Sequence, residues 1–133
     1  MSVFLDTSYV IALANKSEAM HERAMQTAEL IKKGEFGSIF TSSYVFDEAV
    51  TFTLTRQGHT KALALGTSIL NSEITLIHIS QWHFEKAWQL FAEGKELSFT
   101  DCTSIAAMQE NGIKNIATFD KGFTQFKGIN PIG

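Results

Sequence analysis

Short apolar runs alternate with longer segments of helical periodicity along most of the chain. The apolar runs predict strands at Ser2–Asp6, Gly37–Thr41, Ile74–Ile79 and Asn115–Phe119, with a last extended piece at Gly128–Ile132. The periodic segments predict helices in a run from the first strand to Ala14, at Glu18–Lys33, Ser43–Arg56, Thr60–Leu70 and Trp82–Ala92, and after Ser98. Strands that alternate with helices indicate an α/β fold with a mostly parallel sheet. The strands are apolar throughout, which is typical of a sheet covered on both faces.

Two of the predicted helices carry more apolar surface than one buried face needs. In Trp82–Ala92, the residues Phe84, Ala87, Trp88 and Phe91 follow the spacing of a buried stripe, and we expect them to form core. The segment Thr60–Leu70 is apolar around much of its circumference, so we expect it to be either buried or part of an interface.

The amino-acid composition limits the classes of protein to which the chain can belong. The chain has 133 residues, of which 44% are hydrophobic and 19% charged, and this predicts one globular domain over residues 1–133. The single cysteine, Cys102, excludes an internal disulfide and is expected to be an inert buried thiol. We expect a cytoplasmic protein with no membrane partner, because no apolar run is long enough to span a bilayer and MSVFLDTS lacks the features of a secretory signal. The net charge of −3 neither favours nor excludes a phosphodiester substrate.

Three of the four aspartates occur where strands end or helices begin. Asp6 and Asp120 each follow a predicted strand directly, and Asp101 opens a helix. The carboxyl ends of parallel strands share one edge of the sheet, and ligands bind beyond that edge. We therefore expect these three carboxylates to meet, although each one alone has an ordinary interpretation as a turn or capping residue.

The fourth aspartate, Asp47, has a neighbouring acid within the helix Ser43–Arg56. Winding this helix at about 100° per residue places Glu48 beside Val45 and Phe52, whereas Asp47 falls nearer Thr51. Glu48 is the better candidate for pointing inward. Apolar residues flank both acids, so either could supply the fourth carboxylate.

The stretch ELSFTDCTSIAAM combines a capping pattern with an acid on an apolar arc. Ser98 and Thr100 are good N-cap residues, and the spacing from Ser98 to Asp101 resembles a capping box. Helical winding places Asp101 between Ile105 and Met108. We expect one of the two hydroxyl residues to cap the helix while Asp101 reaches the cleft instead of closing the box.

Four carboxylates that converge on one cleft repel one another unless they take up protons or bind cations. Hard divalent cations with oxygen ligands, Mg²⁺ or Mn²⁺, suit such a set, and one or two ions are expected. Small hydroxyl residues beside the acids, Thr7, Ser8 and Thr118, are placed to orient the carboxylates. The histidines show no paired ligand spacing, and no P-loop or nucleophile-elbow motif is present, so we expect metal-assisted hydrolysis.

Four segments of the chain carry the acids and their neighbours: LDTSYVIAL, the segment SSYVFDEAV with Glu48, SFTDCTSIAAMQENGI and IATFDKGF. In order and spacing they resemble the motifs of PIN-domain ribonucleases, and most closely those of the small VapC-type toxins of toxin–antitoxin pairs. The likeness extends over essentially the whole chain.

This resemblance implies a three-layer α/β/α sandwich around a short parallel sheet and a Mg²⁺- or Mn²⁺-dependent endoribonuclease. It implies that Asp6, Glu48, Asp101 and Asp120 are the catalytic, metal-binding acids, supported by Thr7 or Ser8 and by Thr118. A homodimer and a small protein antitoxin that occupies the active-site groove are also implied. From its position beside Asp120, Lys121 is a candidate contact to an RNA phosphate. The alternatives are a non-enzymatic PIN-like module that binds protein or RNA and, with less support, a phosphatase of small phosphoesters.

Overall fold

The computed structural model describes all residues from Met1 to Gly133 and contains one five-stranded sheet. The strand order is β3-β2-β1-β4-β5, and all four neighbouring pairs run parallel, as predicted. The strands are β1 (Ser2–Leu5), β2 (Ser38–Ser42), β3 (Thr75–Ile77), β4 (Asn115–Ala117) and β5 (Asn130–Ile132). The central strand β1 is enclosed by its two neighbours and is almost wholly buried.

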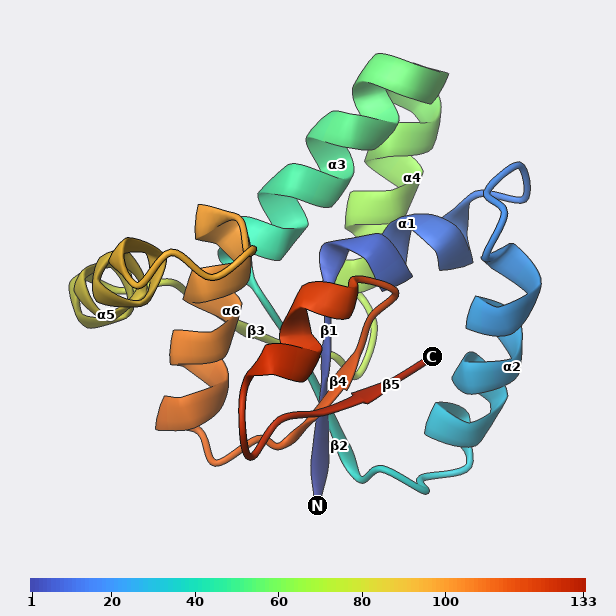
Figure 1. Ribbon diagram of the computed structural model, residues 1–133. Coiled ribbons are helices and arrows are strands. Elements are labelled where there is room, and N and C mark those ends of the chain that lie inside the picture. The colour runs from blue at the N-terminus through green and yellow to red at the C-terminus, as the bar shows by residue number, and fades with distance from the viewer.

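Helices cover both faces of the sheet, which gives the three layers expected from the sequence (Figure 1). Figure 1 shows α6 on one side with α5 outside it, α1 and α2 on the other, and the α3–α4 pair beyond the carboxyl ends of the strands. The helices are α1 (Thr7–Ala14), α2 (His21–Lys32), α3 (Ser43–Gln57), α4 (His59–Leu70), α5 (Gln81–Ala92), α6 (Phe99–Glu110) and the 3-10 helix η1 (Lys121–Gln125). None of these helices combines the length and apolarity that crossing a membrane requires.

The register of the two central strands aligns the first and last acidic segments. Leu5 pairs with Ala117 across β1 and β4, and the amide of Asp6 donates to the carbonyl of Ala117 at 3.0 Å. Strand β4 ends at Ala117, two residues earlier than predicted, so Thr118 already belongs to the connection that follows. Asp6 and this connection therefore leave the sheet side by side at its carboxyl edge.

The prediction of a buried aromatic stripe on α5 is wrong. Its aromatic members Phe84, Trp88 and Phe91 are between 41% and 59% exposed, and of the expected stripe only Ala87 is buried. Trp82, at the start of the same helix, is 49% exposed. Among helices and strands, α5 packs closely only on α6, and it does so through His83, Ala87 and Leu90. This buried face is one residue position out of step with the aromatic stripe, which corresponds to a rotation of about 100°.

Helix α4 divides into a buried and an exposed face. Ala62, Gly66 and Ile69 are buried, and the helix packs on α3, while Leu63 and Leu70 remain exposed. The apolar residues predicted around much of Thr60–Leu70 are thus buried on one side of the helix only.

Candidate active site

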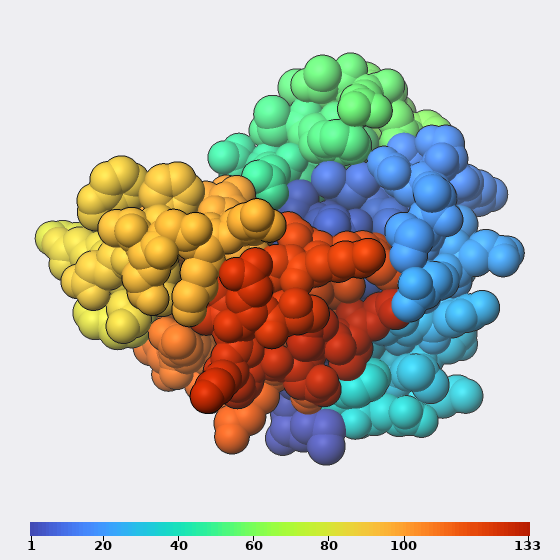
Figure 2. Space-filling model, in the orientation of Figure 1, coloured from blue at the N-terminus to red at the C-terminus, as the bar shows by residue number.

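The four predicted acids lie in one cleft of about 380 Å³ at the carboxyl edge of the sheet. Asp6 follows β1, Glu48 lies on α3, Asp101 lies in the first turn of α6, and Asp120 follows β4. Figure 2 shows this face of the molecule hollowed between the α3–α4 pair, in green, and the segments of α5 and α6, in yellow to orange. The cleft is lined by Asp6, Thr7, Ser8, Ile11, Glu48, Phe52, Ser98, Asp101 and Asp120.

Two hydroxyl groups hold the carboxylate of Asp6 by one of its oxygens. The Oδ2 atom accepts hydrogen bonds from Ser8 Oγ at 2.9 Å and from Thr118 Oγ1 at 2.7 Å. The other oxygen, Oδ1, is buried and has no hydrogen-bond partner in the protein. Asp6 is only 2% exposed, and this burial raises its pKa; the two hydroxyl donors counteract the rise in part.

The same hydroxyls order the backbone that carries Asp120. Ser8 Oγ accepts the amide of Phe119 at 3.0 Å, and Thr118 Oγ1 accepts the amide of Asp120 at 3.0 Å. Each hydroxyl has one proton, which it donates to Asp6, and therefore acts as an acceptor toward the backbone. Asp120 in turn caps η1, because its Oδ1 accepts the amide of Gly122 at 2.8 Å. Asp6 and Asp120 are thus coupled through the two hydroxyls.

Of the two hydroxyls that follow Asp6, only that of Ser8 contacts its carboxylate. Thr7 lines the same cleft, but its Oγ1 is buried without a hydrogen-bond partner. Thr118 occupies the supporting position that the sequence suggested for it.

Asp101 both caps its helix and lines the cleft, so the expectation that it leaves the capping box open is wrong. Ser98 is the N-cap residue: its Oγ accepts the amide of Asp101, and Asp101 Oδ2 accepts the amide of Ser98, both at 3.1 Å. A carboxylate has two oxygens, and this box uses one of them. Burial, followed by the negative charge of Asp6, raises the pKa of Asp101 to about 7.

Of Glu48 and Asp47, only Glu48 lines the cleft of the other acids. Glu48 lines both that cleft and a neighbouring hollow, whereas Asp47 lines the neighbouring hollow alone and accepts a hydrogen bond from Thr51 Oγ1 at 3.3 Å. Both side chains are exposed. The structure therefore groups Glu48, not Asp47, with the other three acids.

A second hollow adjoins the cleft and shares Asp120 with it. Lys121 lines this second hollow together with Arg23 and Phe119, outside the acidic cleft itself. Sequence reasoning identified Lys121 but missed Arg23, which is distant in sequence. It also missed the role of Phe52 as a wall of the cleft, although the four-residue spacing from Glu48 places both on one helical face.

The cleft suits a divalent cation that keeps part of its water shell. No three acidic, histidine or cysteine side chains are arranged to enclose an ion by themselves. Mg²⁺, however, is commonly bound through one or two carboxylates with water completing its shell. The buried Oδ1 of Asp6 lacks a hydrogen-bond donor, and burial raises the pKa of Asp6 and of Asp101, so a bound cation would stabilise the charged form of both carboxylates. The residues present therefore fit such an ion.

The chain belongs to the PIN domain family, whose model matches residues 3–129. It is 32% identical to the 23S rRNA-specific endonuclease VapC20 of Mycobacterium tuberculosis over 124 aligned residues, and the alignment covers 92% of each chain. The crystal structure of M. tuberculosis VapC20, described as a Sarcin-Ricin loop cleaving toxin, matches with a TM-score of 0.83 and 31% identity over 92% of this chain and 93% of that one.

The fold extends to more distant toxin–antitoxin proteins. VapBC2 from Rickettsia felis, crystallised with a DNA fragment from its promoter, matches with a TM-score of 0.74 and 17% identity over 99% of this chain and 98% of that one. At this identity the similarity concerns the fold alone. The family resemblance and the three-layer architecture expected from the sequence are thereby confirmed.

Proposed function

We propose that this protein is an endoribonuclease that hydrolyses RNA phosphodiester bonds with Mg²⁺ or Mn²⁺, and that it is the toxin of a toxin–antitoxin pair. The observation that carries the proposal is the cleft in which Asp6, Glu48, Asp101 and Asp120 meet, with one buried oxygen of Asp6 free of any donor. The membership of the PIN family and the similarity to an rRNA endonuclease over nearly the whole chain support RNA as the substrate.

In this proposal, side chains of the protein hold the acids of the cleft in position to act on a phosphodiester. Ser8 and Thr118 hold Asp6 by its Oδ2 and leave Oδ1 without a donor, and Ser98 holds Asp101 by its Oδ2 through the capping box. Glu48 is exposed at the cleft and can orient water by hydrogen bonding. Asp6, Asp101 and Asp120, with Glu48, would hold one or two divalent ions. When bound, such an ion supplies an activated water and offsets negative charge on the phosphate oxygens.

Metal removal is the direct test of this activity. Purified protein incubated with total RNA is expected to cut it in Mg²⁺ or Mn²⁺ and to lose the activity in EDTA, as mapping of new RNA 5′ ends would show. Since the similar mycobacterial protein acts on 23S rRNA, ribosomal RNA is the first substrate to examine. Cleavage that persists unchanged in EDTA would exclude the metal-dependent mechanism. Turnover of a generic aryl phosphate without RNA cleavage would favour a phosphatase.

The toxin assignment has its own test in cells. Expression of the chain in a bacterium is expected to arrest growth, and co-expression of a small antitoxin encoded beside it is expected to restore growth. Growth that is unaffected by a chain shown to be folded and active on RNA would argue against the toxin role.

We also propose that the protein forms a homodimer, and that the exposed aromatic face of α5 is buried against a second copy. Four aromatic side chains that are about half exposed offer on the order of 400 Å² of apolar surface, about half of what one partner contributes to a standard interface. Three of them also pack around the ring of Phe99, which makes the face continuous. Aromatic residues are enriched in interface centres.

Light scattering at micromolar concentration is expected to give the mass of a dimer for the wild-type chain and to shift toward the monomer in Trp88→Ser. Leu63→Ser is a matched control, because Leu63 on α4 is 60% exposed and Trp88 is 59% exposed. Equal masses for the two variants, or a monomeric wild-type protein, would contradict this interface.

A further inference from the structure

Two arginines lie over phenylalanine rings at the borders of the acidic cleft. The guanidinium carbon of Arg56 is 4.8 Å from the centroid of Phe52, which lines the cleft. The guanidinium carbon of Arg23 is 5.9 Å from the centroid of Phe119, and these two residues line the adjoining hollow that shares Asp120 with the cleft. The two borders are formed by segments far apart in the sequence.

Both arginines are exposed and keep most of their hydrogen-bond donors free. Arg23 donates one Nη2 hydrogen bond to the main-chain oxygen of Gly133, the last residue described, and Arg56 makes no side-chain hydrogen bond. Neither arginine contacts the carboxylate of an Asp or Glu side chain, since the structure has such contacts only at His83–Glu110 and Lys95–Glu93. A ring beneath a guanidinium limits its motion while leaving its planar donors directed outward.

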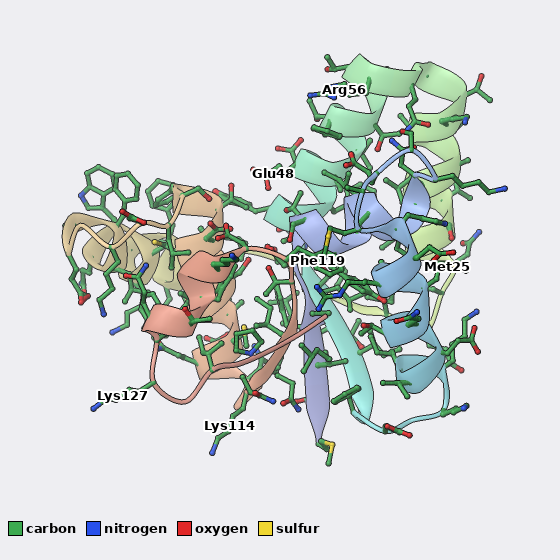
Figure 3. The ribbon with its side chains drawn as sticks, turned by 45° about the vertical axis from the view of Figure 1, so that its right-hand side comes forward. Met25, Glu48, Arg56, Lys114, Phe119 and Lys127 are labelled. Carbon is green, nitrogen blue, oxygen red and sulfur yellow. The ribbon has the colours of Figure 1, made fainter.

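Arg56 follows Glu48 and Phe52, two residues that line the cleft, along α3. Glu48, Phe52 and Arg56 are spaced four residues apart on α3, so they share one helical face, and Arg56 lies about 12 Å along the axis from Glu48. Figure 3 shows Glu48 and Arg56 at different heights of α3 and Phe119 toward the middle of the molecule.

The charge of the cleft explains why cations are needed at its borders. Asp6, Glu48, Asp101 and Asp120 together repel a polyanion, and a bound cation offsets that repulsion only locally. A nucleic-acid strand gains most of its sequence-independent affinity from contacts between its phosphates and basic side chains. Positive groups on two sides of the cleft would therefore hold the strand while one linkage lies over the acids.

We propose that Arg56 and Arg23 bind backbone phosphates of the RNA strand on opposite sides of the cleft, so that the strand runs from the Phe52 wall on α3 to the hollow beside Phe119. This assignment rests on the proposed function only in taking RNA as the ligand. The two arginines act by positioning the strand and do not touch the reacting linkage.

Binding of a fluorescein-labelled single-stranded RNA of mixed sequence, followed by anisotropy in EDTA, tests the assignment in an Asp6→Asn background that does not cut the probe. Arg23→Gln and Arg56→Gln are each expected to raise Kd about tenfold at low salt and to lower the slope of log K against log salt by about 0.7. Arg56→Lys keeps the charge and is expected to retain the slope, which a merely structural role of Arg56 would not predict.

Lys114→Gln and Lys127→Gln are the matched controls, because they remove the same charge from exposed residues that Figure 3 shows at the opposite end of the molecule. They are expected to change Kd less than about twofold, because in this proposal the two lysines make no contact with an RNA phosphate. Arginine variants that bind like these lysine variants, in a chain that cuts RNA, would overturn this inference and leave the proposed function intact. RNA binding that depends on the two arginines, by a chain that cuts no RNA, would support this inference and overturn the proposed function. Absence of RNA binding by the unmodified chain would overturn the inference.

Discussion

Asp6→Asn is expected to lower the rate of RNA cleavage by at least about 10²–10³-fold, the scale on which one preorganised electrostatic contact contributes to catalysis. Asp6 is the most deeply buried acid of the cleft, and its Oδ1 is the oxygen left without a donor. Asparagine has nearly the same shape and can still accept from Ser8 and Thr118, but it lacks the negative charge that would hold a cation. The loss should therefore appear in kcat and not in the fold.

Asp47→Asn is the matched control for this substitution. Asp47 is an exposed aspartate on α3 beside Glu48, but it does not line the acidic cleft, so its replacement is expected to change cleavage less than about threefold, because solvent and salt screen an exposed charge outside the cleft. Circular dichroism and thermal unfolding of both variants would show that they are folded. Full activity of Asp6→Asn, or equal losses in both variants, would contradict the assignment of the cleft.

In the absence of divalent cations, the free energy of unfolding is expected to fall as pH rises from about 4 to about 7. The pKa of Asp101 is about 7 in the folded protein and 3.8 in a model compound, so between these values the folded state binds more protons than the unfolded state. Stability is then fully present below pH 3.8 and is lost as pH rises through 7. The pKa of Asp6 is raised as well, which adds to the same trend. The total effect is on the order of a few kcal/mol.

Urea unfolding at several pH values in EDTA would measure this dependence. Asp101→Asn is expected to flatten it, because asparagine cannot ionise yet can still accept the amide of Ser98 in the capping box. Added Mg²⁺ is expected to raise the unfolding temperature more at pH 8 than at pH 5, because Asp101 is charged above its pKa of about 7 and a cation that binds only the folded state stabilises it. A metal-free protein that gains stability between pH 4 and 7 would contradict the prediction.

The sequence predicted the parts of the cleft that follow from the order and direction of the strands. Asp6 and Asp120 follow adjacent parallel strands, and the rule that such strands end at one edge of the sheet is sufficient to bring them together. The helical winding that favoured Glu48 over Asp47 agrees with the structure, in which Glu48 lines the acidic cleft and Asp47 does not. The capping box at Ser98 was visible in the sequence, but that one carboxylate could close the box and also line the cleft required the atomic positions.

The error on α5 has a clear physical origin. Periodicity identifies an apolar stripe, but it does not say whether another element covers that stripe. In α5 the stripe with the largest side chains remains exposed, while the smaller Ala87 lies in the buried face against α6. The buried face of α5 consists of His83, Ala87 and Leu90 against α6, and the sequence alone did not reveal which neighbour α5 would meet.

By itself the sequence determined the alternation of strands and helices, the parallel sheet and the acids at its carboxyl edge, because these follow from local periodicity and from the short-range geometry of the chain. Only the tertiary structure decided which acid oxygens remain free, which face of α5 is exposed, and that Arg56 lies over a wall of the cleft while Arg23 lines the hollow beside it. Those features depend on contacts between segments far apart in sequence, such as the hydroxyls of Ser8 and Thr118 on Asp6, and no local pattern encodes such contacts.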